Sequence, residues 1–156
     1  MPTVFDGALF ADYHQVYLSD AVNPPTLPDE WRDEDLRRRV TLADRALVLS
    51  TARNMEVPVT VELHAARPMP DLAPVDHAVE ASLRVPSGKL IIAGLTDEMK
   101  TAARIAVPKV ELRILVLFTG LGSLSEDGLA GDDRYTVHLW PEKAGGTVVH
   151  RQWQGD

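Results

Sequence analysis

The chain of 156 residues contains no cysteine. This absence excludes disulfide bonds, thiolate nucleophiles and zinc sites built on sulfur, and it is typical of proteins in a reducing compartment. The segment from Met1 to Asp6 carries neither a basic stretch nor a long apolar run. We therefore expect no signal peptide and no membrane insertion, and a cytoplasmic location.

Basic residues are missing from a long stretch near the C-terminus. Between Arg113 and Arg134 there is no lysine, arginine or histidine, and four carboxylates occupy the glycine-rich second half of this stretch: Glu126, Asp127, Asp132 and Asp133. The whole chain has 23 acidic and 16 basic residues, which gives a formal net charge of -7. This balance argues against direct binding of nucleic acid, which requires clustered Lys and Arg, and it suits a basic protein partner.

The sequence also lacks the common motifs of metal sites and enzymes. Its five histidines never stand two or four positions apart: His14, His64, His77, His138 and His150. The acidic segment misses the spacing of a calcium loop, Gly120-Leu-Gly122 has no following lysine, and no Gly-x-Ser-x-Gly elbow occurs. We expect no metal site, no cofactor and no catalytic residues, and therefore a protein that is not an enzyme.

Composition and patterning predict one domain over residues 1–156. Hydrophobic residues make up 45% and charged residues 25% of the chain, as in ordinary globular proteins. Many short segments of β-forming residues are separated by turn signals, which predicts an all-β or mainly β protein with one or two short helices, folded as an antiparallel β-sandwich of about 8–10 strands. The expected strands lie within residues 8–20, 46–51, 57–65, 77–85, 89–93, 104–107, 110–119, 134–140 and 148–153.

Some local features are predicted in more detail. Residues 29–40 place acids first and arginines last, which favours a helix of about two turns with Asp33 as a candidate N-cap. Residues 77–85 and 89–93 flank Pro86-Ser87-Gly88 and are expected to form a hairpin. Residues 67–74 are rich in proline and are expected to form a long surface loop. Side chains alternate between the two faces of a strand, which places Tyr135 in the core with Val137 and Leu139. The same alternation places Trp140 on the other face and does not decide whether it is buried.

The acidic segment has two interpretations. Asp127-Gly128 and Gly131-Asp132 are turn dipeptides, and Asp side chains often accept hydrogen bonds from nearby backbone amides, so some of these carboxylates are expected to hold the loop. Glu126 has no such local role. It is therefore the strongest candidate for contact with a partner.

Three stretches together resemble the competence protein J family. These are Tyr13-His14-Gln15, the segment from Pro24-Pro25 through Trp31 to an apolar strand that ends in Ala52-Arg53-Asn54, and Asp132-Asp133-Arg134-Tyr135. The namesake of the family inhibits a DNA-entry nuclease. The resemblance implies a small cytoplasmic inhibitor or immunity-type protein that binds a nuclease directly, and it carries over no binding residues.

The sequence thus favours a non-catalytic inhibitor that presents an acidic surface to a partner nuclease. The candidate binding residues are chosen by charge: Glu126, Asp127, Asp132 and Asp133, with Asp33, Glu34 and Asp35. Tyr13, His14 and Gln15 could line the same surface, although strand pairing or packing is the expected role. The alternative is a β-sandwich module for a small ligand such as a carbohydrate, with Trp140 or Trp31 as its stacking surface. A hydrolase would require two carboxylates that converge in a cleft.

Overall fold

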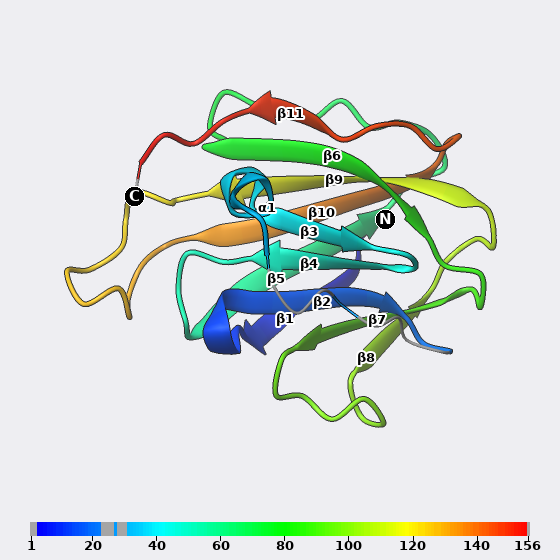
Figure 1. Cartoon of the computed structure of the whole chain (residues 1–156), viewed down its shortest axis with the longest axis horizontal. Coiled ribbons are helices and arrows are strands. Elements are labelled where there is room, and N and C mark those ends of the chain that lie inside the picture. Colours follow the sequence, from blue (N-terminus) through cyan, green and yellow to red (C-terminus); the bar gives the residue numbers. More distant parts are fainter. Residues whose placement is uncertain (1–2, 23–26, 28–30, 156) are drawn as a thin grey trace.

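The computed structural model describes residues 3–22, 27 and 31–155, and within them two β-sheets face each other. The first sheet has six strands, in the order β1 (Thr3–Phe10), β5 (Glu56–Leu63), β10 (Arg134–Pro141), β9 (Glu111–Thr119), β6 (His77–Arg84) and β11 (Val148–Arg151). The second has five, in the order β3 (Val40–Ala43), β4 (Ala46–Ser50), β2 (Gln15–Asp20), β7 (Lys89–Gly94) and β8 (Ala103–Ala106). The β-sandwich predicted from the sequence is confirmed, as the two layers in Figure 1 show.

The pairing is antiparallel except at one place. β5 and β10 run parallel in the middle of the six-stranded sheet, with Tyr135 opposite Val59 and His138 opposite Glu62. Two parallel strands need a long connection, and here residues 64–133 separate them. This pair therefore brings together segments that lie about 80 positions apart in the sequence.

Alternation along the strands explains the main core. Val57, Val59 and Val61 of β5 point inward with Tyr135 and Val137 of β10, and all are buried. The prediction that Tyr135 belongs to the core is confirmed. A second, smaller apolar cluster lies on the outer face of the six-stranded sheet, beneath the proline-rich loop, and contains Val75, Ala78, Leu115, Leu117 and Trp140 with Leu72.

The prediction of a hairpin around Pro86-Ser87-Gly88 is wrong. β6 pairs with β9 and β11, whereas β7 pairs with β2 and β8 in the opposite sheet, so this turn crosses between the layers. The crossing is fastened by the buried carboxylate of Asp20, which accepts hydrogen bonds from the backbone N–H of Ser87 at 2.9 Å and of Val22 at 2.8 Å. Both strands are buried along most of their length, and each has a paired neighbour on both edges.

The predicted helix of about two turns is present, and residues 29 and 30 of the predicted range lie outside the described part of the chain. Helix α1 spans Asp33–Arg38, and its N-cap is Arg32 and not Asp33. The Asp35 carboxylate accepts the N–H of Arg32 at 3.0 Å, which satisfies a free amide of the first turn. A 3-10 turn, η1 (Asp12–His14), separates β1 from β2, where the sequence indicated one or two strands. No helix in the described residues is both long and apolar enough to cross a membrane.

A buried ion-pair network lies on the outer face of the six-stranded sheet. The Glu80 carboxylate is only 3% exposed and accepts hydrogen bonds from Arg67 at 2.9 and 3.0 Å, from Arg113 Nε at 2.8 Å and from His150 Nε2 at 2.9 Å. Burial opposes ionisation of this carboxyl, but the hydrogen bonds from Arg67, His150 and Arg113 outweigh burial and lower the pKa of Glu80 to about 2. The network joins β6, β9, β11 and the proline-rich loop.

Replacing Glu80 by Gln should make the free energy of unfolding depend less on pH in the acidic range. Because the pKa of Glu80 is lowered from 4.5 to about 2, its contribution is complete above pH 4.5 and is lost as the pH falls towards 2. We expect Glu80→Gln to reduce the free energy of unfolding by about 2–4 kcal/mol at pH 7, with the difference shrinking at low pH. Urea unfolding at several pH values measures this. Glu98→Gln, at an exposed position, serves as the charge-matched control; equal effects of the two substitutions would contradict the prediction.

Candidate functional site

Parts of the three stretches that carry the family resemblance, Tyr13-His14-Gln15, Ala52-Arg53-Asn54 and Asp132–Tyr135, meet at one end of the sandwich, whereas Pro24-Pro25 lies outside the described residues. Because β5 and β10 are parallel, the segments that precede them lie side by side, and the turn before β2 joins them through hydrogen bonds to the 51–55 turn. We call residues 11–14, 51–55 and 120–133 the loop end. In Figure 1 the loop between β9 and β10 projects at the left, near the C-terminal end of the chain.

A buried network holds the loop end together. Asp133 is fully buried, and its carboxylate accepts hydrogen bonds from Arg53 Nε and, at 2.5 Å, from the Tyr135 hydroxyl. The Tyr135 oxygen in turn accepts the N–H of Ala52 at 2.7 Å. Burial, together with the Asp133 carboxylate, raises the pKa of Tyr135 above its usual range, so it remains a hydroxyl donor. Asp133 therefore joins the acidic loop to the 51–55 turn, and its burial removes it from the candidate binding surface.

The acidic loop is organised as two nested turns. At its base, the Ser123 hydroxyl donates to the carbonyl of Gly120 at 2.6 Å and accepts the N–H of Asp132 at 2.7 Å. Gly120 has φ +70, and a Cβ atom there would lie 2.3 Å from the Asp132 carbonyl oxygen, so only glycine fits. At the tip, Ser125 N–H donates to the carbonyl of Ala130 at 2.8 Å. The loop is thus shaped before any partner binds.

The remaining loop carboxylates are exposed. Asp127 accepts hydrogen bonds from the Ser125 hydroxyl at 2.6 Å and from the Leu129 N–H at 3.0 Å, and these lower its pKa. This is the turn-forming role expected for an aspartate before glycine. Within the described part of the chain, the carboxylates of Glu126 and Asp132 make no hydrogen bond and no ion pair. Glu126 and Asp132 are therefore the loop acids that face solvent without an internal role.

Tyr13 lies in η1 and not in a strand, although the sequence favours a role in strand pairing or packing. Its side chain is 69% exposed, so packing does not explain it. Tyr13 and His14 both have left-handed backbone conformations, with φ of 54 and 62. Such conformations cost about 1–3 kcal/mol per residue outside glycine and concentrate at functional sites. The Asn54 Oδ1 atom accepts the Tyr13 N–H at 2.9 Å and holds this conformation.

The acids of α1 differ in their accessibility. Asp35 is half-buried and engaged by Arg38 at 2.9 Å, and Glu34 lies 3.5 Å from the same guanidinium, whereas Asp33 is exposed. The six residues of α1 extend only about 9 Å. Asp33 and Glu34 thus present the accessible carboxylates of α1, while Asp35 caps the helix.

The C-terminal segment links α1 to the acidic loop. His77 Nε2 contacts the carbonyl of Arg38 at 2.8 Å, and its Nδ1 accepts the N–H of Trp153 at 3.1 Å. This pattern assigns the ring proton to Nε2, and burial lowers the pKa of His77, which favours the neutral ring. The Trp153 ring lies against Gly122 at the base of the loop. The C-terminal segment therefore contacts the base of the acidic loop directly and the C-terminal end of α1 through His77.

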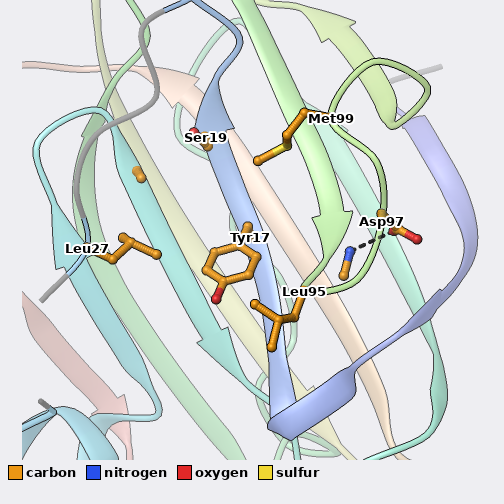
Figure 2. Close-up of a pocket in the computed structure, with 8 residues that line it drawn as sticks. Tyr17, Ser19, Leu27, Leu95, Asp97 and Met99 are labelled. Atoms are coloured by element: carbon orange, nitrogen blue, oxygen red, sulfur yellow. Dashed lines mark hydrogen bonds between the residues drawn. The ribbon is translucent and has the colours of Figure 1, made fainter. Parts of the chain in front are cut away.

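Of the two tryptophans named as candidates for carbohydrate stacking, Trp140 is too buried to serve. Trp140 is buried under the proline-rich loop, with the Arg67 guanidinium 4.9 Å from its ring centre, and Trp31 is half-buried. A cavity of about 200 Å³ lies elsewhere, on the outer face of β2 and β7. Figure 2 shows Tyr17 between Leu27 and Leu95, with Met99 above them. This lining is mostly apolar and contains no tryptophan, so it does not suit a sugar.

The sheet also gathers side chains that are distant in the sequence. His64 Nε2 and His138 Nδ1 lie 2.9 Å apart, and the Glu62 carboxylate lies 3.5 Å from the first ring and 3.8 Å from the second. Burial lowers the pKa of His138, with Glu62 acting in the opposite direction. Local spacing could not indicate this cluster, because His64 and His138 stand 74 positions apart.

Comparisons with known proteins bear on the fold. No family model and no curated protein matches the chain by sequence. The structure of ComJ, inhibitor of the DNA degrading activity of NucA, from Bacillus subtilis is similar, with a TM-score of 0.70 and 16% identity over 90% of this chain and 97% of that chain. The crocagin biosynthetic gene J protein matches with a TM-score of 0.58 and 22% identity, over 88% and 96% of the two chains. The resemblance inferred from the sequence is thus confirmed at the level of the fold.

Removing the Tyr135 hydroxyl should destabilise the protein. Tyr135→Phe leaves one oxygen of Asp133 and the N–H of Ala52 without their partner, which should lower the free energy of unfolding by about 1–3 kcal/mol. Tyr17→Phe is the matched control, because that half-buried hydroxyl donates only to the nearby Gln15 side chain. Denaturant unfolding followed by circular dichroism measures both variants. The prediction fails if Tyr135→Phe is no more destabilising than Tyr17→Phe.

Proposed function

We propose that this protein is a non-catalytic inhibitor that binds a partner nuclease in the cytoplasm through the loop end. The observation that carries the proposal is a set of exposed carboxylates on a loop that the buried Arg53, Asp133 and Tyr135 network ties to the 51–55 turn, with the exposed Tyr13 hydrogen-bonded to the same turn through Asn54. The ComJ structure, which belongs to an inhibitor of a DNA-degrading activity, shares this fold and supports the same class of function. The partner is a protein, and the acidic surface disfavours direct contact with nucleic acid.

The chemistry of a nuclease explains why carboxylates would inhibit it. A nuclease must bind the phosphates of its substrate, so its substrate groove is positively charged. Glu126, Asp127 and Asp132 offer negative charge from a loop that is already shaped, and Asp33 and Glu34 are further exposed carboxylates. A preformed loop loses little conformational entropy on binding, and opposite charges accelerate association. The inhibitor would therefore compete with the substrate for the same groove.

Tyr13 would supply the apolar part of the contact. Tyrosine is enriched among the residues that contribute most to the binding energy of protein interfaces. A side chain 69% exposed on a strained turn can bury a large area against a partner without reorganising the rest of the protein. The two kinds of contact would then affect different rate constants. The tyrosine lowers the dissociation rate constant, and the carboxylates raise the association rate constant.

The proposal is tested first by affinity capture from the native host. The wild-type protein and a variant with Tyr13→Ala, Glu126→Gln and Asp132→Asn are immobilised side by side, and captured proteins are assayed for degradation of DNA. We expect a nuclease on the wild-type support and much less on the variant support, with activity that falls when free wild-type protein is added. Equal capture by both supports would exclude the loop end as the binding surface, and capture of no nuclease would contradict the function.

Neutralising the loop should slow association with that nuclease. At low ionic strength we expect Glu126→Gln to reduce the association rate constant several-fold, and addition of Asp132→Asn to bring the reduction to about tenfold, with a flatter salt dependence. Stopped-flow or surface plasmon resonance measures the rates. Glu98→Gln changes the net charge equally at another exposed site and should have little effect. Indistinguishable rates for Glu98→Gln and Glu126→Gln would show that only net charge matters.

Replacing Tyr13 by glycine should separate binding from stability. Glycine adopts the left-handed conformation without strain, so the free energy of unfolding should stay within about 1 kcal/mol of the wild-type value. Affinity for the nuclease should fall by at least about 2 kcal/mol, or roughly thirtyfold. Met69→Ala, at an apolar residue 92% exposed outside the loop end, is the control and should leave affinity unchanged. Retained affinity in Tyr13→Gly would exclude this side chain from the interface.

A further inference from the structure

Glu62, His64 and His138 form a compact set of potential metal ligands. Their nearest ligand atoms, one carboxylate oxygen and two ring nitrogens, all lie within 4.8 Å of one another. The three pairwise distances are 2.9 Å between the two rings, and 3.5 and 3.8 Å from the Glu62 oxygen to His64 and His138. No other group of three such residues occurs in the described ranges, 3–22, 27 and 31–155.

The backbone places these ligands on rigid elements. Val61 of β5 and Leu139 of β10 point into the core, so Glu62 and His138 point to the outer face of the sheet, where they stand opposite each other in the parallel pair. His64 follows β5, and its N–H donates to the carbonyl of Leu139 at 2.8 Å, which keeps it beside the same strand. Sites built on strands hold ligand geometry better than sites on free loops.

The dimensions match a tetrahedral zinc ion. Zinc binds imidazole nitrogen and carboxylate oxygen at about 2.0–2.2 Å, so neighbouring ligand atoms of a tetrahedron lie about 3.3–3.5 Å apart. The three observed distances between ligand atoms, 2.9, 3.5 and 3.8 Å, lie below, within and above that range. Small rotations of the three side chains would open the space between the two rings, which at present share one hydrogen bond.

The surroundings also favour a cation at this point. His138 is buried, Glu62 and His64 are half-buried, and the buried Leu115 of β9 stands beside His138 in register. A partly dehydrated site strengthens the attraction between a cation and the Glu62 carboxylate. Two imidazoles with one carboxylate suit zinc and its neighbours among the divalent transition metals, and do not suit calcium or magnesium, which prefer oxygen.

We propose that Glu62, His64 and His138 bind one Zn²⁺ ion, or a similar divalent transition metal, on the outer face of the six-stranded sheet. Three protein ligands leave one coordination position for water or for a donor atom from another molecule. The ion would join β5 to β10 at a point away from the loop end, which lies before the first residues of both strands. This site is independent of the proposed inhibition, so either can fail without the other.

The test is direct titration of the full chain after treatment with EDTA and dialysis. Isothermal titration with ZnCl₂ should give one equivalent bound per chain, and Co²⁺ should develop the visible absorption of a tetrahedral complex. At a hundredfold excess of Zn²⁺ over its dissociation constant, the melting temperature should rise by about 5–10 °C. Absence of stoichiometric binding would overturn the proposal and leave the two rings as a simple hydrogen-bonded pair.

Variants assign the ligands. His64→Gln and Glu62→Gln, at half-buried positions that should not disturb folding, are expected to weaken Zn²⁺ binding at least tenfold and to abolish the tetrahedral Co²⁺ spectrum. His150→Gln is the matched control. His150 also contacts a glutamate, Glu80, but it does not belong to the group of three potential metal ligands. Unchanged affinity in folded His64→Gln protein, or equal loss in His150→Gln, would show that the metal binds elsewhere.

Discussion

The parallel pairing of β5 and β10 determines where the loop end and the histidine cluster of this protein lie. Each of these strands follows a connecting segment, and parallel strands begin at the same edge of a sheet, so the 51–55 turn and the acidic loop meet there. Further along the same register, Glu62 faces His138. One pairing therefore creates both the loop end and the histidine cluster.

The acidic loop illustrates a division of roles among neighbouring carboxylates. Asp133 is buried and paired with Arg53, so its charge holds the loop in place and is compensated internally. Asp127 shapes the tip through hydrogen bonds to its own turn. Only Glu126 and Asp132 keep their carboxylates directed to solvent without such a role, which makes a small part of the acidic segment available to a partner. Tyr13, which is bonded to the 51–55 turn, combines high exposure with a left-handed backbone conformation of a kind that is concentrated at functional sites.

Local patterns in the sequence were sufficient for much of the architecture. Alternation in residues 57–65 and 134–140 correctly placed Val57, Val59, Val61 and Tyr135 in the core, because a strand exposes successive side chains on opposite faces. The family resemblance led to the correct fold. Pairing partners were harder to infer: β6 and β7 are adjacent in the sequence yet belong to different sheets, because two strands buried on both faces can pair with many neighbours.

The sequence by itself determined the β-sandwich, the acidic character and the turn chemistry of the loop, since these depend on local propensity and charge. Only the tertiary structure decided which carboxylates are exposed, that Tyr13 is strained and accessible, and that His64 and His138 share a site. The physical reason is that burial and contact depend on register between strands distant along the chain. A shift of β10 by one residue in that register would move His138 to the opposite face of the sheet, away from Glu62.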